Sequence, residues 1–417
     1  MTALIVAGEA IFSLPFAITR YFRPTFLQVF DFTNLELGQA QSVYGVVAIL
    51  SYFAGGPVAD LYSARKLMTA SLLSTAVGGL YMASIPGVGA MSTLWGIWGA
   101  TTIVLFWAAM IRATRDWGGS DSQGRAFGIL DGGRGLFSAI LALAAVQLFK
   151  ATMPEQGMEV TPAIRAEALA QIIHTYTAAT FLAAVFVWFG VPDVAPNSSD
   201  KSENNAILKT IVQVMKRPTI WLHALIVMAA YVGYKATDFI GQYAEEAFKM
   251  SEVDAAQLSS ISAWVRPVAA ILAGFAADRW LSSKVISVSF VVMIAIYGYV
   301  AFSTPEPNLT WILVLEISLA CTAVYGLRGV YFALFEEAAL PLYITGTATG
   351  FVSVVGYTPD IFVTPIAGWL LDNYPGIAGH QYFNMFLMGF ATLGLISSLI
   401  FGFLARDSVN AEPIKTK

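Results

Sequence analysis

Two short stretches decide the fold: Gly55–Lys66 reads GGPVADLYSARK, and Ala273–Lys284 reads AGFAADRWLSSK. Each places an aspartate at the end of an apolar run and follows it with basic residues. The two aspartates, Asp60 and Asp278, are 218 residues apart, about half of the 417-residue chain. This spacing predicts that the second half of the chain repeats the first.

The chain is far more apolar than a soluble protein. Hydrophobic residues make up 57% of it and charged residues 12%, whereas a soluble domain has about 25% charged residues. Apolar windows of about 20 residues, each long enough to cross a bilayer as a helix, recur along the whole length. The first run has no signal-peptidase pattern, so we expect it to be a membrane helix rather than a removed signal peptide. The composition predicts a multi-pass helical membrane protein.

Breaks at proline, glycine and charge clusters divide the chain into twelve predicted helices. They lie at 3–30, 37–60, 67–86, 91–115, 126–150, 166–191, 219–248, 257–279, 285–304, 309–335, 346–371 and 382–405. We therefore expect a six-helix bundle at 1–192, a cytoplasmic linker at 193–217, a second bundle at 218–405 and a cytoplasmic tail at 406–417. Within the linker, apolar residues at helical spacing over 206–217 predict a short amphipathic helix on the membrane surface.

Lysine and arginine are concentrated in the connections on the same side as this linker. The opposite side has only Lys150, Arg165 and Lys249. Because cytoplasmic loops of membrane proteins are enriched in basic residues, we expect both termini in the cytoplasm, and we expect the protein in the inner membrane of a bacterium.

The two opening stretches resemble the loop signature of the major facilitator superfamily. The shared pattern, G-x-x-x-D before a basic-rich turn, is found at Gly56–Asp60 and Gly274–Asp278. The resemblance covers essentially the whole chain. It implies an all-α membrane protein of twelve transmembrane helices in two six-helix bundles, working as a transporter by alternating access, and we expect a monomer in the lipid bilayer.

The same resemblance implies a cytoplasmic gate at the two turns, formed by Asp60, Arg65, Asp278 and Arg279. Their plainer interpretation is that they are polar helix ends. In the first copy Leu61 replaces the basic residue that the family usually places after the aspartate. We therefore expect the first copy to close less tightly than the second.

Several basic residues fall inside predicted helices, where a charge at the bilayer centre costs at least about 2.5–3.5 kcal/mol. Those nearest the middle are Arg20, Arg134, Lys235 and Arg266, and we expect them to bind substrate. The resemblance implies that the first, fourth, seventh and tenth helices line a central cavity, with Arg20 and Lys235 face to face. Two facing cations are stabilised by an anion between them, which predicts an anionic substrate.

Local neutralisation is the alternative for two of these bases. Asp131 precedes Arg134 by three residues and Asp238 follows Lys235 by three, spacings that allow pairing within one helix. Arg20 has no acid at such a distance.

Three segments resemble one branch of the superfamily, the organophosphate:phosphate antiporters and organic-anion carriers. They are FAITRYF in the first helix, residues 111–135, and GTATGFVSVVGY at Gly346–Tyr357. That branch uses an arginine in the seventh helix, where this chain has Lys235, and a lysine does not bind a phosphate bidentately. We therefore predict a small organic anion, which includes carboxylates, sugar acids and phosphate esters.

Buried acids are candidates for proton coupling, because burial raises the pKa of a carboxyl group and a neighbouring cation lowers it, so that protonation and substrate occupancy compete. The candidates are Asp238, Glu316, Asp131 and Asp360. Glu316 has no base within a helical turn; pairing with a cation from another helix is the alternative for Glu316 and Asp360. The choice between uniport, proton symport and exchange against a counter-anion stays open.

Other functions have less support. Three scattered histidines and the single Cys321 give no metal-binding spacing or disulfide, and no catalytic constellation or phosphate-binding loop is present. We expect no enzyme activity, no cofactor or metal and no nucleic-acid partner. Two alternatives remain. A multidrug efflux carrier is expected to have isolated acids in an apolar cavity. A ligand-sensing receptor of the same fold would be supported by a long cytoplasmic extension. Aromatic residues that could contact a substrate include Trp107, Tyr44, Tyr234 and Tyr325.

Overall fold

The computed structural model describes residues 1–119, 123–154, 158–194, 212–340 and 342–411. Each of the twelve predicted segments is helical within these ranges. Ten helical segments in the described part are long and apolar enough to cross a membrane. The prediction of an all-helical multi-pass membrane protein is confirmed.

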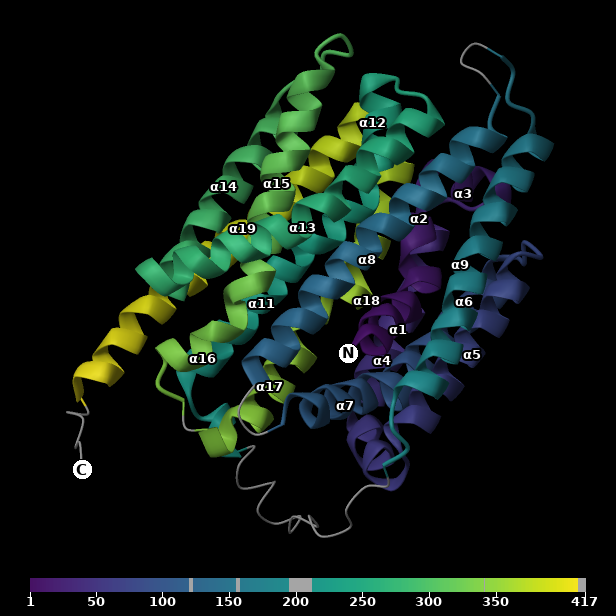
Figure 1. The fold of residues 1–417 in the computed structure, drawn as a ribbon. Helices are drawn as coiled ribbons and strands as arrows, with labels where there is room; N and C mark the ends of the chain where they lie inside the picture. Colours follow the sequence, from purple (N-terminus) through teal and green to yellow (C-terminus); the bar gives the residue numbers. More distant parts are fainter. Residues whose placement is uncertain (120–122, 155–157, 195–211, 341, 412–417) are drawn as a thin grey trace.

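The first half of the chain forms one group of helices (Figure 1, purple to blue). Its elements are α1 (Thr2–Phe12), η1 (Ser13–Ala17), α2 (Ile18–Tyr21), α3 (Arg23–Phe30), α4 (Asn34–Leu61), α5 (Ala64–Met82), α6 (Val88–Ala100), η2 (Thr101–Trp107), α7 (Ala108–Gly118), α8 (Gln123–Thr152) and α9 (Pro162–Gly190).

The second half forms the other group (Figure 1, teal to yellow). Its elements are α11 (Pro218–Ala236), η3 (Thr237–Phe239), α12 (Ile240–Phe248), α13 (Glu252–Trp280), α14 (Ser282–Phe302), α15 (Thr310–Val330), η4 (Tyr331–Ala333), α16 (Leu334–Glu337), α17 (Leu342–Gly356), α18 (Pro359–Asn373) and α19 (Ile377–Ala411). In the predicted surface helix, residues 212–215 are helical, and 206–211 lie outside the described residues.

Several helices begin earlier than hydropathy predicts, because polar residues cap them. Thr33 and Glu36 form a capping box that starts α4, and Thr161 and Ser251 accept backbone N–H groups at the starts of α9 and α13. Such caps satisfy the free N–H groups of a first turn. The helices therefore extend a few residues beyond their apolar segments.

We call the two ends of the molecule the linker end, where α4, α7, α9 and α13 end, and the far end, where α3, α12 and α18 end. At the far end, the carboxylate of Asp372 in α18 accepts the backbone N–H groups of Asn34 and Leu35, at 3.1 and 2.7 Å. Glycines allow α4 and α18 to touch there, since a Cβ on Gly38 would lie 2.3 Å from the carbonyl oxygen of Thr364. The two halves are thus tightly joined at the far end.

A second contact joins the halves at the far end. Glu252 at the start of α13 accepts hydrogen bonds from Thr25 in α3, at 2.6 Å, and from Arg165 in α9, at 2.7 Å. Arg23 is fully buried and donates from Nε to Gln242 of α12, at 3.0 Å. Two elements of the first half, α3 and α9, are therefore held to two elements of the second, α12 and α13.

Candidate functional site

A cavity of about 330 Å³ lies between the two halves. Residues of both halves of the molecule line it. One of them is Asp131 of α8, whose side chain is 62% exposed. The cavity is therefore open beside α8, toward the linker end, while the far end is closed. All four basic residues that the sequence assigned to the substrate line it: Arg20, Arg134, Lys235 and Arg266.

Four helical segments lose their α-helical geometry beside this cavity. The interruptions η1 and η2 are π-helical, and η3 and η4 are 3-10 turns. They lie in the first, fourth, seventh and tenth segments. Three of them, η1, η2 and η4, carry the cavity-lining residues Phe16, Trp107 and Tyr331. Non-α turns of this kind are frequent at functional sites and hinges.

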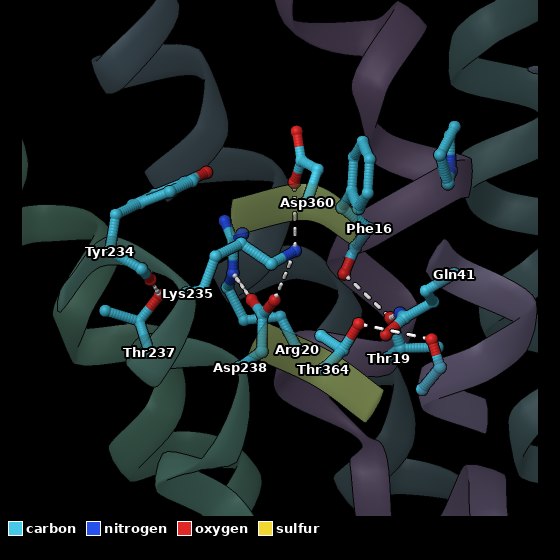
Figure 2. Close-up of polar contacts among 12 residues, drawn as sticks. Phe16, Thr19, Arg20, Gln41, Tyr234, Lys235, Thr237, Asp238, Asp360 and Thr364 are labelled. Carbon is cyan, nitrogen blue, oxygen red and sulfur yellow. Dashed lines mark hydrogen bonds and ion pairs between the residues drawn. The ribbon is translucent and has the colours of Figure 1, made fainter. Parts of the chain in front are cut away.

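Four charged residues from both halves form a group that we call the deep cluster: Arg20, Lys235, Asp238 and Asp360 (Figure 2). Arg20 Nε lies 2.6 Å from Asp238 Oδ1, and Lys235 Nζ lies 3.0 Å from Asp238 Oδ2 and 3.5 Å from Asp360 Oδ1. Tyr231 adds a hydrogen bond to Asp360 at 3.0 Å. The Lys235 and Asp238 side chains are 3% and 2% exposed.

Asp238 therefore occupies the position between Arg20 and Lys235 in which the sequence analysis expected a substrate anion. The pairing of Lys235 with Asp238 within one helix, given above as the alternative, is present. Arg20 also has an acidic partner, but from the other half, so sequence spacing could not show it. Only the Nε of Arg20 forms a hydrogen bond among the described residues, and its two terminal nitrogens are left for another acceptor.

Nearer the linker end lies a looser group, the mouth cluster: Glu9, Asp131, Arg134 and Arg266. Arg134 and Arg266 each lie 3.7 Å from Glu9 Oε2. Arg266 lies 3.3 Å from Asp131, and Arg134 lies 4.0 Å from it. Glu9 was missed by the sequence analysis, although an acid inside the first apolar run was a usable signal.

Arg328 of α15 lies between the two clusters, and the sequence analysis did not count it among the substrate-binding bases. Its guanidinium stacks on the ring of Tyr234, 3.8 Å from the centroid, and Arg20 lies 4.7 Å from the same ring. Within the described residues Arg328 forms no ion pair, and its buried Nη1 has no hydrogen-bond partner. It is the cavity cation that lacks a counter-ion in the described part of the chain.

The proton-coupling candidates divide between two places. Asp131 and Asp360 line the central cavity, and Asp238 lies behind its wall in the deep cluster. Glu316 lines a different, smaller cavity within the second half. The structure thus separates Glu316 from the other three.

Tyrosines account for much of the remaining wall of the central cavity. Tyr44, Tyr234 and Tyr325, suggested by the sequence, line it together with Trp107. Five further tyrosines also line it: Tyr21, Tyr52, Tyr231, Tyr331 and Tyr357. Phenol hydroxyls both donate and accept hydrogen bonds, so the wall suits a substrate with hydroxyl groups.

The predicted gate residues lie at the linker end. Arg65 and Lys66 pair with Asp193 after α9, at 2.6 and 3.5 Å. A hydrogen bond from Ser63, together with these two cations, lowers the pKa of Asp193 below its usual value. The basic pair Arg65–Lys66 of the first motif therefore joins that turn to the end of α9.

The second copy of the motif differs. Asp278 and Arg279 are exposed, and neither forms an ion pair among the described residues. The side chain of Asp60 lies outside the described residues. Among the described residues, the ion pairs at the turns belong to the first copy; they lie inside one half and do not join the two halves.

Known proteins resemble this chain over nearly all of its length. The model of the Major Facilitator Superfamily matches residues 5–363. The inner membrane protein YqcE of Escherichia coli (strain K12) is 28% identical and is aligned over 98% of this chain and 95% of its own. The inner membrane protein YihN of the same strain is 26% identical over 95% and 93%.

Among solved structures, a D-xylose-proton symporter has the same fold, with a TM-score of 0.74, 12% identity and coverage of 96% of both chains. This agreement extends over both halves and fits the cavity between them. The chain belongs to the Major Facilitator Superfamily, as an integral multi-pass transporter and not an enzyme.

Proposed function

We propose that this transporter moves a small organic anion through the central cavity by alternating access. The observation that carries the proposal is Arg328, a cation whose buried Nη1 has no hydrogen-bond partner and which has no counter-ion among the described residues. The two clusters around it contain four basic and four acidic side chains, so Arg328 leaves the group with one net positive charge. An anion that contacts Arg328 would neutralise this charge in a low-dielectric site.

The neighbours of Arg328 define the substrate further. The terminal nitrogens of Arg20 are available in the same cavity, and an arginine fork matches a carboxylate or phosphate group. The tyrosine wall offers hydroxyl groups to the rest of the molecule. A hydroxylated anion, such as a sugar acid or a sugar phosphate, fits both features.

Transport would proceed by rocking of the halves 1–192 and 218–405 about this site. We propose that the linker end faces the cytoplasm of a bacterial inner membrane, because the basic connections lie there. The conformation described above, closed at the far end, would then be the inward-open one. The substrate anion could replace Asp238 as the partner of Arg20, and this change of partner offers one way to couple substrate binding to closure of the cavity. A proton or a counter-anion would then balance the charge.

Other functions of the same fold have less support. A multidrug carrier for lipophilic cations would have to bind its substrate in a cavity with excess positive charge. A sensing receptor would bind the anion without moving it, and uptake into proteoliposomes separates this case from transport.

The first test is thermal stabilisation of the purified protein by sugar acids, sugar phosphates, simple carboxylates and neutral sugars. We expect stabilisation by anions of one of these groups, and an affinity reduced about tenfold or more in Arg328→Gln, since a hydrogen bond to a charged group contributes about 1.5–3 kcal/mol. Arg217→Gln, which removes an exposed arginine outside the cavity and outside the two gate turns, is the matched control. If neutral sugars bind as well as anions, or if Arg328→Gln binds like Arg217→Gln, the proposal is wrong.

A further inference from the structure

A second cavity lies in the second half of the molecule and is lined by residues of α11, η3, α12, α14, α15 and α19. It has a volume of about 80 Å³ and shares no lining residue with the central cavity. The central cavity, at about 330 Å³, is much larger. Apolar and aromatic side chains form most of the wall of the second cavity, so it suits a small ligand that needs few polar contacts.

Glu316 of α15 faces this cavity. Its side chain is 8% exposed, it forms no ion pair among the described residues, and its buried Oε2 has no hydrogen-bond partner there. A carboxylate in such surroundings is costly as an anion, because neither a cation nor a donor stabilises the charge. The ligand that meets both the charge and the small volume is a proton.

Other titratable groups around the cavity indicate how a proton would arrive. Tyr243, Tyr297 and Cys321 face it from α12, α14 and α15, and His380 faces it from α19. The Nε2 atom of His380 lies 3.0 Å from Glu246 Oε2, and the Glu246 side chain is 34% exposed near the far end of α12. Glu246 and His380 thus connect the far-end surface to the cavity that Glu316 lines.

The cavity also touches the deep cluster through η3. Thr237 and Phe239 line the second cavity, whereas Asp238 between them contacts Arg20 and Lys235 on the other side (Figure 2). A 3-10 turn interrupts the helix at this position. A change in charge at Glu316 can therefore act on the Asp238 ion pairs through one short turn.

We propose that the Glu316 cavity is a proton-binding site that is entered from the far end through Glu246 and His380, separately from the substrate path. The proton moves from water to the Glu246–His380 pair and then to the Glu316 carboxylate, where one O–H bond forms; His380 returns to its starting state. Occupancy of the site then biases the Arg20–Asp238 pair through η3. This inference rests on the proposed transport function and adds the route of its proton.

The test uses the whole protein in lipid and no substrate, so its outcome is independent of the anion experiment. Infrared difference spectra between acidic and alkaline pH report the carbonyl stretch of each protonated carboxyl group. We expect one such band, from an acid without a hydrogen-bond donor, to disappear in Glu316→Gln, to shift in Glu316→Asp and to remain in Glu306→Gln. Glu306 is an exposed acid in the connection before α15 and serves as the matched control.

The route is tested by the rate of deuterium exchange at the same band. We expect His380→Ala to keep the band and to slow its exchange about tenfold or more, since a positioned acid–base group accelerates proton transfer strongly. A spectrum that is the same in Glu316→Gln and the parent overturns the site. Exchange as fast in His380→Ala as in the parent overturns the route.

Discussion

The deep cluster and the mouth cluster contain the same kinds of side chain, two bases and two acids each, but their geometry differs. In the deep cluster the tightest contact is 2.6 Å and the Lys235 and Asp238 side chains are almost fully buried. In the mouth cluster the contacts are 3.3–4.0 Å and Asp131 is mostly exposed. Ion pairs out of water depend strongly on their partners, whereas solvated pairs contribute little. The deep cluster should therefore control stability and coupling, and the mouth cluster should mainly attract anions.

The largest effect is expected from Asp238→Asn. It removes the acid bonded to Arg20 and the nearer acid at Lys235, and breaking a buried pair from one side costs about 3–5 kcal/mol. We expect a large loss of stability, measured by unfolding in detergent, and loss of transport. Arg20→Gln combined with Asp238→Asn should recover much of the stability, because no buried charge is then left alone at that contact. A double variant no more stable than Asp238→Asn would contradict the pairing.

Lys235→Met should have the second largest effect on stability. It keeps the apolar stem, but it leaves Asp360 with only Tyr231 and Asp238 with only Arg20 among the partners described above. We expect a loss of about 1–3 kcal/mol in the same unfolding measurement, the cost of leaving a buried polar group unsatisfied. An effect larger than that of Asp238→Asn would show that Lys235, and not Asp238, is the centre of the cluster.

Both clusters were predictable in part from the sequence. A base within an apolar run is visible without a structure, and for this reason Arg20, Lys235, Arg134 and Arg266 were found. The Arg20–Asp238 contact was not, because it joins residues 218 positions apart in two different halves.

Arg328 was not counted among the substrate-binding bases, because the rise per residue gives the depth of a residue but not the direction of its side chain. Its stacking on Tyr234 depends on the rotation of two helices about their axes, and one sequence does not show this. The helix starts were also missed by a few residues, because hydropathy does not detect caps such as Thr33. The twelve segments themselves needed only hydropathy and charge.

Asp131→Asn tests the mouth cluster and should change little. The acid is mostly exposed, and Glu9 still neutralises Arg134 and Arg266. We expect a stability change below about 1 kcal/mol. Anion affinity should rise slightly, most clearly at low salt, because one competing negative charge at the mouth is gone. If Asp131→Asn lost as much stability as Asp238→Asn, the proposed difference between the two clusters would be wrong.

The smallest effect is expected at a contact outside both clusters and outside the membrane, where Asp193 pairs with Arg65 and Lys66. The pKa of Asp193 is lowered in the folded protein. The stabilisation of the fold by the Asp193 carboxylate is therefore present above the usual pKa range of an aspartate. It is lost as the pH falls through the pKa that Asp193 has in the folded protein. The melting temperature of the parent should fall slightly between neutral and acidic pH as this contact is lost. Asp193→Asn should remove this part of the fall and leave transport at neutral pH unchanged. A pH profile identical to that of the parent would show that the contact does not contribute in solution.

The most direct test of the account is uptake into proteoliposomes, with an anion selected by thermal stabilisation and its uncharged analogue, such as a sugar acid and the corresponding neutral sugar. We predict that the parent protein takes up the anion, and that the neutral analogue is neither taken up nor competes. Arg328→Gln should lose most of the anion uptake, while Arg217→Gln should keep it. Equal uptake of the two compounds, or full anion uptake by Arg328→Gln, would contradict the claim that the cavity receives a negative charge.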